Sequence, residues 1–261
     1  MTRRTGPVRR GPVRFPENLT AQRESRSSRM STVHPMSPAE FTGALRGLGR
    51  RYWGSHPFHR RMHAGELSER ELKLWAANRW YYQCLLPQKD AAIVSNCPLP
   101  EIRRIWLDRI VYHDGTAAGE GGAERWLRLC AAVGLDRAEV LDERHVAPGV
   151  RFAVDAYVTF ARTKPWVEAV ASGLTEMFAG HLMQQRVADV LANYAWISRA
   201  DLAYFTNRID KVSGEGKDTL DIVVQHCVTR EQQEKAVSAL SFKCDVLWSM
   251  LDAIERAAAG E

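Results

Sequence analysis

Polar residues four positions apart recur in pairs whose side chains could bind an anion or move a proton. The pairs are Arg79 with Gln83, Arg109 with His113, and Tyr204 with Arg208. Residues at this spacing lie on the same face of a helix, so each pair would point into one space. Arginine carries a fixed positive charge, and histidine changes its protonation near neutral pH. The pairs indicate an internal cationic site, although isolated pairs of this kind are more often solvated on a surface.

Two further charged residues lie where a face used only for packing would not place them. Lys243 comes three residues after Leu240 and four before Leu247, so it falls on the apolar stripe of its helix. There it either extends its ammonium group to the edge of the core or meets an anion. Glu176 is flanked on its own face by small residues that leave room beside the carboxylate, namely Ser172, Gly173, Ala179 and Gly180.

Signals for metal or nucleotide chemistry are weak. His59 and His63 are four apart with Glu66 nearby, but two histidines are far short of a metal ligand set. A di-iron bundle needs Glu and His repeated on several helices, and this sequence does not supply them. The glycines from Gly119 to Gly122 follow no strand, so they indicate a turn between helices and not a phosphate-binding loop.

The elements that must position these residues are expected to be helices. Capping boxes begin at Ser37 and Ser68, and similar helix starts begin at Asp136 and Thr229. Nothing alternates over enough residues to predict a sheet. The expected helices cover 38–49, 68–96, 99–113, 123–133, 136–142, 148–163, 165–192, 198–212, 216–227 and 230–258, with a kink at Pro87.

The N-terminal segment differs in composition from the rest. Residues 1–36 are rich in Arg, Ser, Pro and Gly, so we expect a disordered basic tail. Without residues 1–29, Lys+Arg falls from 36 to 28 and Asp+Glu from 31 to 29, so the net charge of +5 belongs to the tail. It gives no support for nucleic-acid binding. A transit peptide is one alternative, and translation from Met30 or Met36 is the simpler account. Residues 37–261 are expected to form a single compact helical domain.

The cellular location follows from what the sequence lacks. No stretch approaches the roughly 20 apolar residues needed to span a bilayer, and the arginine-rich start has no apolar core of a secretory signal. The five cysteines are scattered and never spaced as CxxC, so neither a disulfide framework nor a zinc ribbon is indicated. We therefore expect a soluble, cytoplasmic protein with reduced thiols and no membrane partner.

Several stretches of the sequence together resemble the pyrroloquinoline-quinone synthase (PqqC) family. They are His56 to His59 (HPFH), Trp75 to Gln83 (WAANRWYYQ), Lys89 to Ile93 (KDAAI), His113 to Gly115 (HDG), Glu143 to Tyr157 (ERHVAPGVRFAVDAY), Leu174 to Glu176 (LTE), and Phe242 to Asp252 (FKCDVLWSMLD). The resemblance covers residues 37–256 in collinear order, so it is far more specific than any single motif.

The resemblance implies an all-α, heme-oxygenase-like or TenA-like helical bundle that forms a homodimer. It implies an oxidase that closes the last ring of pyrroloquinoline quinone (PQQ) by oxidising a small polyanionic quinone precursor, with O2 as co-substrate and no metal or organic cofactor. The family's substrate-binding positions are matched by Tyr52, Arg79, Gln83, Lys89, Arg109, Arg186 and Lys243, and its catalytic positions by His113, Tyr157, Glu176, Tyr204 and Arg208.

These positions make chemical sense together. The six lysines and arginines among them would form a cationic basin for carboxylates and quinone oxygens. A substrate that loses a proton from carbon becomes an electron-rich quinol, which can itself reduce oxygen. His113 is the expected base because its ordinary pKa lies near working pH.

Two residues depart from the family pattern. Trp53 stands where the family has a histidine, and Met183 stands where it has a histidine that helps to hold oxygen and move protons. Methionine neither donates a strong hydrogen bond nor carries a proton, so the resemblance implies an incomplete oxygen pocket. His181 lies about 200° around the helix from Met183 and could replace that histidine only if the helix bulges.

These departures leave two alternative functions open. One is a PqqC-like oxidase of another biosynthetic pathway, and the other is a non-catalytic binder of a quinone-like acid. Trp53 and Met183 favour the binder over the family reaction, whereas His113 and Tyr157 favour catalysis.

Overall fold

The structure is a computed structural model that describes residues 34–260. The chain divides into two units, residues 1–34 and 35–261, and only the second is described below. The predicted disordered tail, residues 1–36, therefore lies outside the described residues except for its last three positions.

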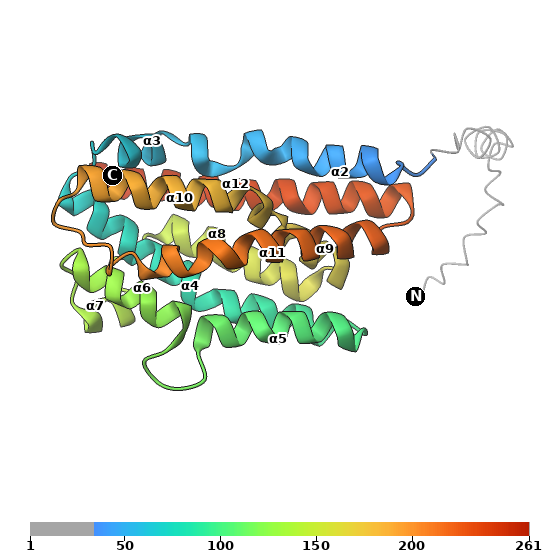
Figure 1. The fold of residues 1–261 in the computed structure, drawn as a ribbon, viewed down its shortest axis with the longest axis horizontal. Helices are drawn as coiled ribbons and strands as arrows, with labels where there is room; N and C mark the ends of the chain where they lie inside the picture. The colour runs from blue at the N-terminus through green and yellow to red at the C-terminus, as the bar shows by residue number, and fades with distance from the viewer. Residues whose placement is uncertain (1–33, 261) are drawn as a thin grey trace, which may run out of the picture. The chain divides into compact units, whose positions relative to one another are not determined.

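Helices make up all the regular secondary structure of residues 34–260, as the sequence predicts (Figure 1). The α-helices are α2 (Pro38–Gly47), α3 (Pro57–Ala64), α4 (Glu69–Asn96), α5 (Pro100–Asp114), α6 (Gly121–Ala132), α7 (Arg137–Leu141), α8 (Pro148–Thr163), α9 (Trp166–Ser172), α10 (Glu176–Asn193), α11 (Ala203–His226) and α12 (Arg230–Ala259). Three short 3-10 helices connect them, η1 (Leu48–Arg51), η2 (Trp53–Ser55) and η3 (Gly173–Thr175).

The helix starts are where the capping residues place them. Ser37, Ser68 and Thr229 each form a complete capping box, in which side chain and backbone hydrogen-bond reciprocally across the first turn. Asp136 accepts from two backbone N–H groups at the start of α7. These caps satisfy donors that a helix N-terminus would otherwise leave unpaired.

Three boundaries differ from the sequence-based expectation. The segment 57–64 is helical because Pro57 suits the first helical position and the ring nitrogen of His56 accepts from the N–H of Phe58 at 3.1 Å. The expected helix 165–192 is divided by η3, which separates α9 from α10. The expected helices 198–212 and 216–227 are one helix, because α11 begins only at Ala203 and continues through Gly214.

Gly216 in α11 serves close packing instead of ending the helix. A Cβ at this position would lie only 3.1 Å from the backbone nitrogen of Met177, so a larger residue would push α11 away from α10. Glycine inside a helix costs about 0.5–1 kcal/mol relative to alanine. Here that cost allows the two helices to approach each other at the start of α10.

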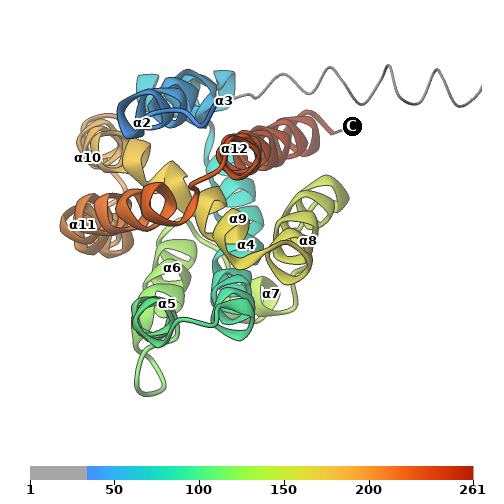
Figure 2. The ribbon, with the colours of Figure 1, turned by 90° about the vertical axis from the view of Figure 1, so that its right-hand side faces the viewer.

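Helix α9 lies in the middle of the bundle, surrounded by α4, α8, α11 and α12 (Figure 2). The last turn of α9 and η3 consist mostly of small, buried residues. Small side chains let the surrounding helices approach closely, as dense protein interiors require. The arrangement fixes Glu176, which follows η3 directly at the first position of α10.

Asn78 clamps the start of α8 onto α4. Its side-chain amide donates to the backbone oxygens of Leu74 and His145 at 2.8 and 2.9 Å, and its oxygen accepts from the N–H of Ala147 at 2.7 Å. Asn78 is fully buried, so these bonds satisfy backbone groups that water cannot reach. The clamp sets the position of α8, which carries Tyr157.

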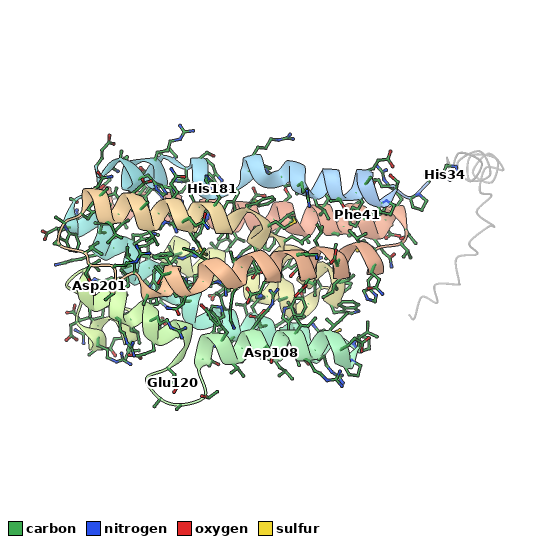
Figure 3. All side chains as sticks on the ribbon, in the orientation of Figure 1. His34, Phe41, Asp108, Glu120, His181 and Asp201 are labelled. Atoms are coloured by element: carbon green, nitrogen blue, oxygen red, sulfur yellow. The ribbon has the colours of Figure 1, made fainter. Side chains whose placement is uncertain are left out.

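The outside of the bundle is charged and polar. Asp108 on α5, Glu120 before α6 and His181 on α10 are exposed (Figure 3). Within the described part of the chain, no helix is long and apolar enough to cross a membrane.

Candidate active site

Six cationic residues are buried in the part of the chain that the structure describes, each at most 7% exposed when the whole residue is counted. Burying a charge costs several kcal/mol unless it is paired or meets a ligand. The six are the residues that the sequence predicts as a cationic basin, namely Arg79, Lys89, Arg109, Arg186, Arg208 and Lys243.

Most of the predicted site residues line one internal cavity. The lining residues that the sequence also predicts as site residues are Tyr52, Arg79, Lys89, Arg109, His113, Tyr157, Glu176, Tyr204 and Arg208. Trp53 and Met183, the two departures from the family pattern, line it as well. The cavity volume is about 60 Å³, well below the roughly 300–1,000 Å³ of typical small-molecule pockets. A substrate with fused rings can therefore bind only if part of the lining moves outward.

The three remaining predicted residues lie directly behind this lining. Gln83 accepts a hydrogen bond from the Tyr204 hydroxyl at 2.8 Å. Arg186 lies beside His59, with 3.2 Å between Nη2 and Nε2, and Lys243 donates to the Tyr82 hydroxyl at 2.8 Å. The structure thus brings all twelve predicted residues and Met183 into one region.

The helices place these residues through simple periodicity. On α5, Arg109 and His113 lie one turn apart and face the same cavity, and Tyr204 and Arg208 do so on α11. The close approach of α6 to this region depends on Gly122. A Cβ there would lie 3.2 Å from Nδ1 of His113, so a side chain would press on the ring.

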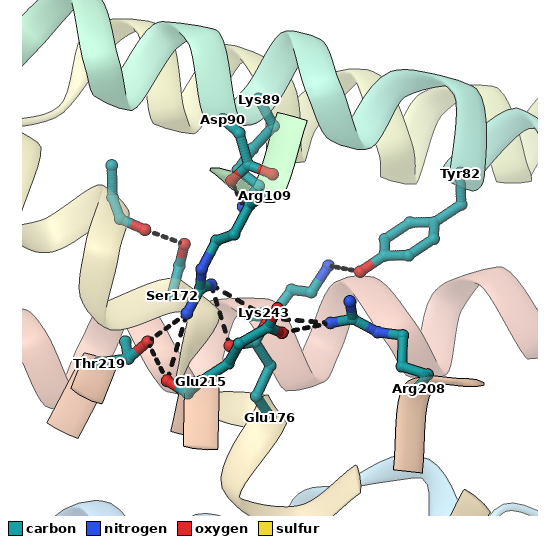
Figure 4. A network of polar contacts seen from close by, with 11 residues as sticks. Tyr82, Lys89, Asp90, Arg109, Ser172, Glu176, Arg208, Glu215, Thr219 and Lys243 are labelled. Atoms are coloured by element: carbon teal, nitrogen blue, oxygen red, sulfur yellow. Dashed lines mark hydrogen bonds and ion pairs between the residues drawn. The ribbon is translucent and has the colours of Figure 1, made fainter. Parts of the chain in front are cut away.

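Three of the buried cations have carboxylate partners (Figure 4). Lys89 is paired with its neighbour Asp90, and both are buried. Arg109 approaches Glu176 with 3.0 Å between Nη1 and Oε2, and it also donates to Thr219 Oγ1 at 2.8 Å. The third cation, Arg208, approaches Oε1 of the same Glu176 carboxylate at 3.3 Å.

Arg79 and Arg186 have no ion-pair partner among the side chains that the structure describes. The Arg79 guanidinium lies 4.2 Å from the Trp53 ring centroid and 4.6 Å from that of Tyr82. Its Nε and Nη1 atoms are buried and donate no hydrogen bond within the part of the chain that the structure describes. Burial, with the nearby charge of Arg79, lowers the pKa of Arg186 to about 10. Unsatisfied buried donors of this kind favour an anionic ligand.

Lys243 does not extend to solvent, because it is only 1% exposed. Its ammonium nitrogen lies 3.3 Å from the centroid of the Tyr157 ring. Burial, followed by the positive charges of Lys89 and Arg79, holds the pKa of Lys243 well below its usual value. An anion placed beside this amine would favour its charged form.

His113 is 3% exposed and its Nδ1 has no hydrogen-bond partner among the described residues. Burial is the largest cause that holds its pKa well below the usual value, and the charges of Arg208 and Lys89 act in the same direction. A histidine in this environment is the neutral imidazole, which is the form that accepts a proton.

Met183 faces the cavity and His181 does not. Met183 is 9% exposed and lines the cavity, whereas His181 is exposed on the outer side of a regular α10. The bulge that would bring His181 inward is therefore absent from α10.

His59 and His63, the two histidines that are four residues apart, have structural partners. Nδ1 of His59 lies 3.0 Å from the backbone oxygen of Trp53, and Nδ1 of His63 lies 2.7 Å from Oδ2 of Asp189. Among the described residues, no group of three or more His, Cys, Asp or Glu side chains is arranged to hold a metal ion. The expected independence from metals and cofactors remains a prediction.

Sequence reasoning missed three residues of this region. Asp90 follows Lys89 in the motif that carries the family resemblance, so its proximity to Lys89 was a usable signal. Tyr82 lies in the Trp75 to Gln83 stretch that carries the same resemblance. Glu215, which contacts Arg208 with 3.0 Å between Oε2 and Nη2, lies in a stretch that was expected to interrupt two helices.

Comparisons with known proteins place this site in context. A model of the TENA/THI-4/PQQC family matches residues 43–253. A protein named pyrroloquinoline-quinone synthase from Acidiphilium cryptum is 49% identical over 85% of this chain and 91% of its own length. Proteins of the same name from Granulibacter bethesdensis and Pseudomonas aeruginosa are 48% and 50% identical, over 89% and 85% of this chain and 92% and 89% of their own lengths.

Solved structures share the fold at low sequence identity. A domain of unknown function with a heme oxygenase-like fold from Shewanella denitrificans gives a TM-score of 0.72 at 11% identity, covering 86% of this chain and 94% of that one. A TenA homolog from Pseudomonas syringae gives 0.67 at 14% identity, covering 85% and 94%. The predicted heme-oxygenase-like, all-helical fold is confirmed.

Proposed function

Because this chain belongs to the TENA/THI-4/PQQC family, we propose that it is a pyrroloquinoline-quinone synthase. It would complete the rings of a polycarboxylate quinone precursor and oxidise it with O2. One observation carries the proposal beyond the family resemblance: all six buried cations of the described chain surround or adjoin a cavity that also contains a neutral, buried histidine.

The cations supply binding and orientation. Arg79 and Arg186 lack carboxylate partners within the described residues, so their guanidinium groups are available to substrate carboxylates. Tyr82 and Tyr157 have rings stacked at 9° between planes, which suits a flat substrate beside them. Holding the substrate in one orientation lowers the entropic part of the reaction barrier.

His113 supplies the base. Its neutral ring accepts a proton from a substrate carbon, and the electron pair of that C–H bond stays in the quinone ring system as a quinol. O2 then accepts an electron pair from the quinol and, with two protons, becomes hydrogen peroxide. Positive charge from Arg208 stabilises both the anion formed at the first step and the reduced oxygen at the second.

We further propose that the reaction uses no metal or organic cofactor and that the enzyme acts as a cytoplasmic homodimer. The support is the family resemblance. The location is additionally favoured by the scattered, free cysteines.

Mixing the purified protein anaerobically with the ring-open PQQ precursor is expected to change the visible spectrum, because binding and proton removal precede oxygen use. Admitting oxygen is then expected to give the spectrum of PQQ together with hydrogen peroxide, and chelators should leave the rate unchanged. A spectrum that stops at the quinol would show ring closure without full oxidation. No spectral change at any stage would contradict the proposed substrate.

Met183→His is expected to speed the oxygen-dependent phase of this reaction, by about tenfold or more, because a histidine at the cavity can donate a proton to reduced oxygen. The anaerobic phase should be unaffected. Gln184→His places the same residue one position along, on the exposed side of α10, and serves as the matched control. Equal oxygen-dependent rates in the wild type and Met183→His would show that this position does not limit oxidation.

A further inference from the structure

One nitrogen of Arg208 is contacted by two different carboxylates (Figure 4). Its Nη2 lies 3.3 Å from Oε1 of Glu176 and 3.0 Å from Oε2 of Glu215. The two carboxylates therefore lie close together on one guanidinium group. All three side chains are largely buried, with exposed fractions of 9% for Arg208, 18% for Glu176 and 16% for Glu215.

The backbone holds Glu215 in this place. Its carbonyl oxygen accepts from Arg109 Nη2 at 3.2 Å and from Thr219 Oγ1 at 2.7 Å. The neighbouring Gly216 keeps α11 against the start of α10, where Glu176 begins that helix. Glu215 is thus fixed beside Glu176 by packing as well as by charge.

The helices around Glu215 bring both signs of charge to it. Arg109 and Tyr112 come from α5, Glu176 from α10, and Arg208 and Lys211 from α11 itself. The other neighbouring elements contribute charges farther away. Arg125 of α6 lies over the Tyr112 ring, Arg46 of α2 lines the outer groove beside Gly216, and Glu168 of α9 acts on Cys227 at the far end of α11.

The charge balance of the inner group is simple. When both carboxylates are ionised, Glu176 and Glu215 cancel the positive charges of Arg109 and Arg208. Adding one proton to Glu215 leaves a net positive charge at this end of the cavity. Burial is the largest cause that raises the pKa of Glu215, and the adjacent Glu176 raises it further, against the lowering effect of Arg208.

We propose that Glu215 is a positioning residue that sets the charge at the Arg208 end of the cavity. As the carboxylate, it holds the Arg208 guanidinium and neutralises it. As the protonated acid, it releases that positive charge to an anionic ligand. Binding of a polyanion is therefore coupled to uptake of a proton by Glu215, because the negative ligand disfavours its carboxylate charge.

This inference depends on the proposed function only for the anionic nature of the ligand, and PQQ itself is the probe. Isothermal titration calorimetry in two buffers with different ionisation enthalpies gives the number of protons taken up on binding. At a pH between the pKa of Glu215 in the ligand-free protein and its higher pKa in the complex, the wild type is expected to take up as much as about one proton more than Glu215→Gln. Equal proton uptake in the two proteins would overturn the proposal.

The affinity should follow the same linkage. Wild-type affinity for PQQ is expected to weaken about tenfold more than that of Glu215→Gln as the pH rises through the range in which Glu215 ionises. The variant keeps a neutral side chain at every pH and lacks this part of the pH dependence. Glu234→Gln is the matched control, because Glu234 is exposed on α12 and paired with Arg230. It should behave as the wild type.

A ligand-free measurement separates this proposal from the proposed function. Infrared spectra of the wild-type protein are expected to show a protonated carboxyl band that titrates above the ordinary range for glutamate and is missing from Glu215→Gln. If PQQ fails to bind but the band behaves in this way, the proposed function is wrong and the proposed protonation of Glu215 is still supported. A band that is unchanged in the variant, or no such band in the wild type, would contradict the proposal.

Discussion

His113→Ala is expected to slow the oxygen-consuming reaction by about 10²- to 10⁴-fold while changing ligand affinity only a few-fold. The ring is the one histidine among the described residues that lines the cavity, so its loss removes the proton acceptor. The arginines and Lys89 that bind the substrate remain in place. Oxygen consumption and a separate ligand titration measure the two effects.

The pH profile of the wild type provides a second test of His113. Its pKa lies well below the usual histidine value, chiefly because of burial. The neutral base is therefore present over the whole neutral range, and kcat/KM should fall only when the pH drops through this lowered pKa. A limb of the profile at the ordinary histidine value, about 6.5, would contradict the assignment.

His181→Ala is the matched control for the same experiment. His181 is exposed on α10, so its removal should leave the rate and the profile unchanged. Normal turnover in His113→Ala would show that another group removes the proton.

Lys243→Met is expected to make the protein more stable by about 1–4 kcal/mol at neutral pH, because it removes a buried amine that has no carboxylate partner among the described side chains. The same change is expected to slow the reaction about 10²-fold, since the substrate loses a donor beside Tyr82 and Tyr157. Denaturant unfolding and oxygen consumption measure the opposite effects on one variant.

The sign of the pH dependence follows from the lowered pKa of Lys243. The unfolded chain binds a proton at this lysine below about pH 10.4, whereas the folded chain binds it only at lower pH. The wild type therefore loses stability as the pH falls through this interval, and the methionine variant does not. The advantage of Lys243→Met should be small at high pH and grow as the pH is lowered.

Lys235→Met provides the comparison on the same helix. Lys235 is 53% exposed and paired with Glu231, so its replacement should change stability little and activity not at all. If Lys243→Met is less stable than the wild type at neutral pH, the buried amine contributes favourable contacts that outweigh its desolvation.

The sequence predicted the features that depend on local chemistry. Capping residues such as Ser68 and Thr229 located helix starts because they satisfy backbone donors within one turn. The i,i+4 pairs located six of the twelve predicted residues, because helix periodicity alone sends Arg109 and His113 to one side. Four others, Tyr52, Lys89, Tyr157 and Arg186, came only from the family resemblance. Residues whose role depends on neighbours in the sequence were therefore predictable.

Residues whose role depends on a distant partner were not. The expected helices 198–212 and 216–227 left residues 213–215 as a break, yet α11 is continuous through them, and Gly216 packs closely against the start of α10. Glu215 lay inside that expected break, so no periodicity connected it to Arg208. The role of Glu215 becomes visible only when α10 and α11 are placed side by side.

The division of the buried cations into two kinds makes the cavity directional. Arg109 and Arg208 share the Glu176 carboxylate, whereas Arg79 and Arg186 act on each other without a carboxylate between them. A ligand with unevenly distributed negative charge gains more from one alignment than from its reverse. In the proposed reaction the same edge of a flat ring system would then face His113 in every turnover, and the placement of the carboxylate partners would determine which carbon loses its proton.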